Sequence, residues 1–272
     1  MIQQNSLLRK ISLWVLILLS INVLFFSTPL PAYAGNPITD VITSIGEFFT
    51  GPKPKSTSAG KQKAGGGRGE QCLINPTIPL IAIAPTLKTS LDRGQNEKSQ
   101  PVYVGGYTTQ DYPTLWFYVP YASSQGREFA KLMLLDEEKT PLFEKAVQFL
   151  LEGTPGIVGV TLPKQDATGR PIPPLQIGKS YSWYFSIVCD LNRPSRNPDV
   201  SGWIERISVA SNARTTAWYD ALDAVIKEHS SNETNTQKDW EVFLGVTGLS
   251  DIRSAKIVRC CTPKSTPSNQ AF

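Results

Sequence analysis

The chain has 272 residues, of which 40% are hydrophobic, with 20 glycines and 21 prolines. This composition can bury a core, so it excludes a disordered tail protein and a fibrous or low-complexity chain. The 27 basic and 23 acidic side chains nearly balance, and nothing in that balance favours a nucleic acid as partner.

Residues 1–34 have the layout of a secretory signal peptide. Arg9 and Lys10 precede a mostly apolar run from Ile11 to Phe26, and Ala32-Tyr-Ala34 follows as a small-x-small cleavage motif. The run is shorter than the roughly 20 residues that span a bilayer core. We therefore expect cleavage after Ala34 and export to the periplasm or the extracellular space.

Residues 35–70 have the composition of a flexible basic linker. Glycine, proline, serine and lysine dominate 51–69, a composition that buries too little apolar area to repay the entropy of ordering. The cations of this stretch are Lys53, Lys55, Lys61, Lys63 and Arg68. A soluble linker is the preferred interpretation, and weak contact with an anionic membrane or wall surface is the alternative.

Residues 71–210 contain seven strand candidates separated by turn residues and without helical periodicity. They are 80–84, 114–119, 129–135, 142–149, 157–162, 181–188 and 200–209. Residues 129–135 and 142–149 flank an acidic turn and suit a hairpin. The series predicts a mainly β fold, an antiparallel Ig-like β-sandwich.

Alternation along these strands separates expected core positions from candidate ligand positions. Tyr181, Trp183, Phe185 and Ile187 share one face of their strand, which we expect to lie inside. Outward aromatic residues would form a sugar-stacking platform, and the candidates are Trp116, Tyr118, Tyr184 and Trp203. Asp190, Glu205 and Arg206 are candidates for a polar patch at one edge of the sandwich, where an ordinary ion-pair cluster is the simpler interpretation.

The period changes after residue 211. Ala217, Ala221, Leu222 and Val225 recur at helical spacing, which predicts an amphipathic helix over 214–228. Trp240, Phe243 and Leu244 mark a second short helix. We therefore expect a helical C-terminal extension over 211–259 and a tail over 260–272.

Cys72, Cys189, Cys260 and Cys261 lack the spacing of a zinc site. In an exported chain they are disulfide candidates. A bond between the adjacent Cys260 and Cys261 is disfavoured because the ring it closes is strained. Two pairings tie the tail to both Cys72 and Cys189, and the third joins Cys72 to Cys189.

Catalytic signatures are absent from the sequence. There is no phosphate-binding loop, no dinucleotide-binding GxGxxG after a strand, no HExxH and no calcium loop. His229, the single imidazole, is expected at the end of a helix, where a structural role suffices. We expect no cofactor, no metal and no enzymatic activity.

Five sequence segments together resemble a known family. They are Gly65-Gly-Gly-Arg-Gly69, Tyr112–Tyr121, Gly153–Val158, Ile177–Asp190 and Gly202–Arg206, with the Trp218–Leu222 helix in addition. Together they are similar to the cyanobacterial exported proteins grouped as domain of unknown function 928. The resemblance implies a secreted protein of photosynthetic bacteria and assigns no activity or catalytic residue.

These observations predict a non-enzymatic binding or scaffold module of the bacterial envelope, whose partner is an envelope protein or a glycan. The alternative is a carbohydrate- or wall-binding protein that stacks sugars on exposed aromatic residues, with Asp190 and Glu205 as its catalytic candidates if it also acts on the wall.

Overall fold

The computed structural model of the chain describes residues 59–65, 76–88, 102–123, 129–209, 217–231, 237, 240–241, 243–245, 247–261 and 263. The predicted signal peptide, most of the predicted linker, Cys72 and most of the tail lie outside the described residues. The described residues belong to one compact unit of the chain.

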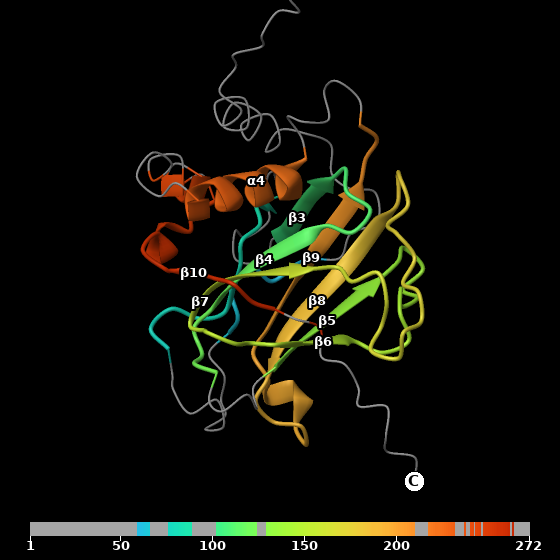
Figure 1. The fold of residues 1–272 in the computed structure, drawn as a ribbon, viewed down its shortest axis with the longest axis horizontal. Helices are drawn as coiled ribbons and strands as arrows, with labels where there is room; N and C mark the ends of the chain where they lie inside the picture. The colour runs from blue at the N-terminus through green and yellow to red at the C-terminus, as the bar shows by residue number, and fades with distance from the viewer. Residues whose placement is uncertain are drawn as a thin grey trace, which may run out of the picture. The chain divides into compact units, whose positions relative to one another are not determined.

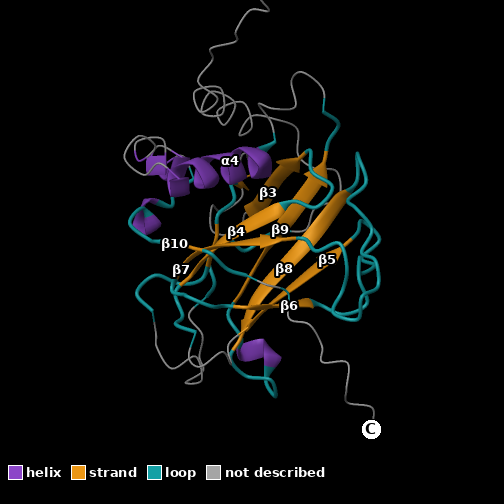
Figure 2. Cartoon of the chain, in the orientation of Figure 1, coloured by secondary structure: helices purple, strands orange, loops and turns teal. Residues whose placement is uncertain are grey.

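Two β-sheets form the framework of the described chain (Figures 1 and 2). The four-stranded sheet has the order β1 (Ile81–Ala82), β4 (Thr114–Val119), β7 (Gly156–Thr161) and β10 (Ile257–Val258). The six-stranded sheet has the order β2 (Thr86–Lys88), β3 (Val102–Thr108), β9 (Asp199–Arg206), β8 (Ser180–Val188), β5 (Phe129–Leu135) and β6 (Val147–Leu150). The prediction of a mainly β sandwich with a short helical extension is confirmed.

The two sheets are mixed. Most neighbours are antiparallel, including the β5–β6 hairpin, but β3 runs parallel to β9 and β10 runs parallel to β7. Both parallel pairs join strands that are far apart in the sequence. The prediction of antiparallel sheets is therefore wrong for these two pairs. Alternation within a strand predicts which side chains face the core, but not the direction of a neighbour that is distant in the sequence.

The core lies between the two sheets and is rich in aromatic rings. Phe117 of β4 stacks on Phe185 of β8 with ring centroids 3.8 Å apart, and it meets Trp183 edge-on at 5.7 Å. Tyr181, Trp183, Phe185 and Ile187 are all buried, as their alternation predicts. This packing defines the inner face of β8, so the intervening residues of that strand lie on the outer face of the six-stranded sheet.

Residues 59–65 belong to the sandwich, which corrects the prediction of a flexible linker for this stretch. Lys61 exchanges backbone hydrogen bonds with Ser201 of β9 (2.8 and 3.0 Å), and Ala64 donates to the carbonyl of Leu80. The Lys61 ammonium also pairs with Asp199 at 2.9 Å, and Lys63 pairs with Asp251 at 3.8 Å. Two of the five linker cations are thus engaged within the molecule, while Lys53, Lys55 and Arg68 lie outside the described residues.

Helix α4 (Trp218–Ser231) lies beside β3 and β4, one strand from each sheet (Figure 2). Two short 3-10 helices, Pro194–Arg196 and Ser250–Ile252, are also present, and the described residues among 237–245 are helical, where the sequence predicts a second short helix. In the first turn of α4, Asp220 accepts hydrogen bonds from the hydroxyl and backbone amide of Thr109 (2.5 and 2.9 Å) and from the hydroxyl of Thr108 (2.5 Å). The helix is therefore fixed to the end of β3 by one carboxylate as well as by its buried apolar face.

Three tryptophans lie directly across from glycines in neighbouring strands. The pairs are Trp116 with Gly159, Trp183 with Gly202, and Trp203 with Gly105. A methyl group at any of these glycines would fall within 3.0 Å of the facing ring. Gly105 also has φ of 147°, which L-residues rarely adopt. Glycine thus provides the space in which each indole lies over the neighbouring strand.

Candidate functional site

The outer face of the six-stranded sheet carries the one exposed aromatic residue among the predicted ligand candidates. Tyr184 is 40% exposed there, and its cross-strand neighbours are Met133 of β5 and Ser201 of β9. Lys131 and Asp199 flank Ser186 in the next row of the same face. We call Lys131, Met133, Tyr184, Ser186, Asp199 and Ser201 the Tyr184 face.

The Tyr184 face combines an aromatic ring with hydroxyl groups and little net charge. Met133, Ser186 and Ser201 are partly exposed around the ring. The negative charge of Asp199 is balanced by Lys61, which lies 2.9 Å away. An aromatic ring beside hydrogen-bonding hydroxyls suits a polar ligand with an apolar face, whereas a strongly charged ligand would find little complementary charge here.

Trp203 lies on the same outer face but is only 1% exposed, which corrects its assignment to an exposed platform. Tyr107 packs edge-on against the indole, with centroids 5.3 Å apart at 77°. The carbonyl of Trp203 accepts hydrogen bonds from the Trp183 indole (3.2 Å) and from the Tyr219 hydroxyl (3.1 Å). Burial raises the pKa of Tyr219, which keeps this hydroxyl protonated as a donor. Trp203 therefore serves the packing of the sandwich.

Trp116 and Tyr118 lie on the opposite side of the molecule, on the outer face of the four-stranded sheet. Trp116 is 9% exposed, and its indole N–H donates to Asp223 of α4 at 3.3 Å. The prediction that Trp116 is an exposed stacking residue is wrong, because α4 packs over this end of β4. Tyr118 is partly exposed, and burial raises the pKa of its hydroxyl. The four predicted aromatic residues do not form one platform.

Asp190 organises the loop that follows β8. Its carboxylate accepts hydrogen bonds from the backbone amides of Asn192 (2.9 Å) and Arg193 (3.1 Å) and from the Arg193 guanidinium (2.8 Å). Burial acts to raise the pKa of Asp190, but the Arg193 side chain and the two amides outweigh it and lower that pKa. Every described partner of Asp190 is local, so the residue has a structural explanation.

Glu205 and Arg206 lie at the other end of the sheet from Asp190. Arg206 forms an ion pair with Asp111 and donates to the carbonyl of Leu175 at 2.6 Å. Glu205 pairs in register with Ser180, the first residue of β8, whereas Asp190 lies just beyond Val188, the last residue of that strand. At about 3.3 Å per residue along the strand, the backbone positions of the two residues are about 30 Å apart.

This separation is incompatible with the predicted polar patch of Asp190, Glu205 and Arg206. Paired carboxylates that act on one glycosidic bond lie about 5–10 Å apart. Asp190 and Glu205 are too far apart to act on one bond, and the edge patch that would have combined them with Arg206 does not form. Asp190 and Glu205 each lie near the C-terminal end of a strand. Because β8 and β9 are antiparallel, these two ends lie at opposite edges of the sheet.

Lys131 and Met133 are members of the outer face that were not among the predicted ligand residues. The signal was available, since the residues of β5 alternate strictly between buried and partly exposed positions.

In the described part of the chain, no three metal-ligating side chains gather in one place. Within the same residues, no helix has the length and apolar character needed to cross a membrane.

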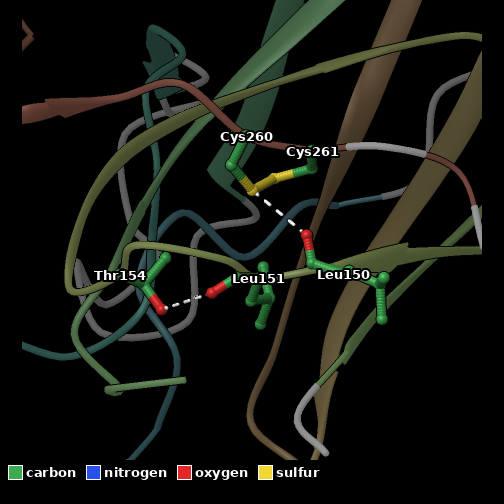
Figure 3. Close-up of a disulfide and its surroundings, with 5 residues drawn as sticks. All are labelled: Leu150, Leu151, Thr154, Cys260 and Cys261. Carbon is green, nitrogen blue, oxygen red and sulfur yellow. Dashed lines mark hydrogen bonds between the residues drawn. A yellow bond between two sulfur atoms is a disulfide. The ribbon is translucent and has the colours of Figure 1, made fainter. Parts of the chain in front are cut away.

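The cysteines pair differently from the preferred expectation. Cys260 and Cys261 are bonded to each other (Figure 3). Cys189 is also in a disulfide. The Cα atoms of the two neighbours Cys260 and Cys261 are 3.1 Å apart. The expectation that adjacent cysteines avoid each other, and with it the ties from the tail to Cys72 and Cys189, is corrected.

Comparison with known proteins places this fold in a family. No curated protein and no solved structure matches the chain. The family described as Domain of Unknown Function (DUF928) matches residues 63–257, which include β1 to β9 and helix α4 in full and end within β10. The match begins within the ordered 59–65 segment, in agreement with its place in the sandwich. The chain belongs to the family Domain of Unknown Function (DUF928).

Proposed function

We propose that this chain is an exported, non-enzymatic binding or scaffold module of the bacterial envelope, and that the Tyr184 face is its binding surface. The observation that carries the proposal is the exposure of Tyr184 at the centre of a sheet face, between Met133 and Ser201. Aromatic residues provide much of the binding energy at protein surfaces because they bury a large area with few torsions to fix.

Export rests on the first 34 residues, whose charged start, apolar run and Ala32-Tyr-Ala34 motif are those of a secretory signal. The resemblance of Tyr112–Tyr121 and Ile177–Asp190 to exported cyanobacterial proteins adds a cyanobacterial origin to the proposal. The distance between Asp190 and Glu205 supports binding over wall hydrolysis by that pair.

A photo-crosslinking amino acid at position 184 tests this proposal in cells. We expect a covalent adduct to an envelope component, and a much weaker one from position 191, where Leu191 is 69% exposed on a loop. Equal labelling from the two positions, or no adduct from either, would overturn the assignment of the Tyr184 face.

A glycan is the second candidate ligand, and the hydroxyl groups of Ser186 and Ser201 beside the Tyr184 ring favour it. On a glycan array, Tyr184→Ala should weaken binding by about 5- to 30-fold, which corresponds to about 1–2 kcal/mol for a buried aromatic anchor. Leu191→Ala is the matched control and should bind as the unmodified protein does. Absence of binding to every glycan would remove this candidate while leaving a protein partner.

A further inference from the structure

The chain passes from one sheet to the other immediately after β10. Val258 pairs with β7 in the four-stranded sheet, and Pro263 forms a bridge with Phe149 of β6 at the edge of the six-stranded sheet. We call Cys260, Cys261 and Pro263 the strap. The sulfur of Cys260 lies 3.2 Å from the carbonyl oxygen of Leu150, at the end of β6 (Figure 3). The disulfide thus lies at the crossing between the two sheets.

The Cys260–Cys261 bond cannot stabilise the fold in the way that disulfides usually do. A disulfide restricts the unfolded chain by closing a loop, and the effect grows with the length of that loop. Adjacent residues enclose no loop. Cys189 has no cysteine beside it in the sequence, so the disulfide that it forms must close a loop. The adjacent pair therefore needs an explanation other than cross-linking.

Accessibility and chemistry give that explanation. Both cysteines are partly exposed, although they also pack against the core. A disulfide that solvent can reach exchanges with thiolates, and a dithiol is the reductant class that completes such an exchange. We propose that Cys260–Cys261 is a thiol–disulfide exchange site whose substrate is a dithiol reductant, and that its reduction loosens the strap from β6.

The exchange proceeds in two steps. A thiolate of the reductant attacks one sulfur, the Cys260–Cys261 bond breaks, and a mixed disulfide forms while the other cysteine leaves as a thiolate and takes up a proton. The second thiol of the reductant then attacks the mixed disulfide and releases the remaining cysteine as a thiol. In sum, two electrons and two protons pass to the protein, and the reductant becomes a disulfide.

Reduction removes the link that holds the two side chains together at the crossing. Reduction gives Cys260 an S–H group that the disulfide lacks, and this thiol is only a weak donor to the Leu150 carbonyl. The two side chains no longer restrict the backbone at the crossing. β6 is the edge strand of the six-stranded sheet in the described part of the chain, and the bridge from Pro263 to Phe149 covers part of it. Loosening the strap therefore exposes the polar backbone groups of an edge strand.

Titration of the full chain with dithiothreitol, followed by alkylation and mass spectrometry, tests the exchange. We expect Cys260 and Cys261 to be alkylated at a reductant concentration at least about tenfold below that needed for Cys189, because only the latter disulfide gains from loop closure. Alkylation of Cys189 at the same or a lower concentration, or resistance of the adjacent pair, would overturn the proposal.

Hydrogen exchange tests the structural consequence. Under mild reduction, exchange should become faster in peptides containing 147–150 and 257–261 and remain unchanged in 180–188. The double variant Cys260→Ser/Cys261→Ser should show the faster exchange without reductant and should not respond to it. If exchange in the unmodified protein is the same before and after reduction of the pair, the strap does not respond to the disulfide.

Discussion

Substitution of Gly159 by alanine tests whether the tryptophan–glycine pairs determine the packing of the sandwich. A Cβ at this position would lie 2.8 Å from Cη2, 2.9 Å from Cζ3 and 3.0 Å from Cζ2 of Trp116. Ordinary carbon contacts are 3.4 Å or more. The ring would have to retreat, but Asp223 holds its indole nitrogen at 3.3 Å and only 9% of the residue is exposed.

Two opposing effects give the expected magnitude. Insertion of a methyl group into a packed site costs about 1–3 kcal/mol. Alanine in place of a strand glycine stabilises the fold by about 0.5–1 kcal/mol, because it reduces the entropy of the unfolded chain. We expect Gly159→Ala to lower the free energy of unfolding by about 1–2 kcal/mol, which is about 2–8 °C in Tm for a domain of this size.

Urea denaturation of a double-mutant cycle measures this coupling. In a Trp116→Leu background the clash is gone, so Gly159→Ala should become neutral or stabilising by up to about 1 kcal/mol. Gly245→Ala is the matched control, because Gly245 is helical and no atom lies within 4 Å of its added methyl group, so a small gain is expected. If Gly159→Ala destabilises equally with and without Trp116, the reasoning is refuted.

Two further predictions concern carboxylates. Asp220→Ala should lower the free energy of unfolding by about 2–3 kcal/mol in urea because Thr108 and Thr109 lose their acceptor, whereas Glu228→Ala on the exposed side of α4 should change it by less than about 0.5 kcal/mol; equal effects would contradict the docking role of Asp220. The Thr168 hydroxyl, aided by Arg170, lowers the pKa of Asp166 to about 2, so its contribution to stability is complete above about pH 4 and is lost as the pH falls towards 2. Asp166→Asn should remove that part of the acid dependence, and an NMR titration that places the carboxyl near its ordinary pKa would contradict the assignment.

The sequence predicted those parts of the fold in which local pattern decides the outcome. β4 and β5 begin and end where alternation and flanking prolines or charged turns place them. β3 was missed because Gly105 and Gly106 interrupt its apolar alternation, and the glycine is there to admit Trp203 from the next strand. β2 and β10 are too short to show a period.

The candidate site was harder to predict, because alternation shows which side of a sheet a residue faces but not what covers that side. Trp116 and Trp203 were assigned correctly to outer faces, yet α4 covers one and Tyr107 packs against the other. Lys61 and Lys63 belong to a composition typical of linkers, and only backbone pairing with β9 and β1 reveals their place in the sandwich. Tyr184 remained exposed, and its role as a binding residue stays a prediction.

Export is the claim on which the envelope function depends, and the N-terminus of the protein purified from its own cells tests it most directly. Sequencing by mass spectrometry should find a chain that begins at Gly35 in the periplasmic or extracellular fraction. A chain that retains Arg9, Lys10 and the apolar run and occurs in the cytosol would contradict the account.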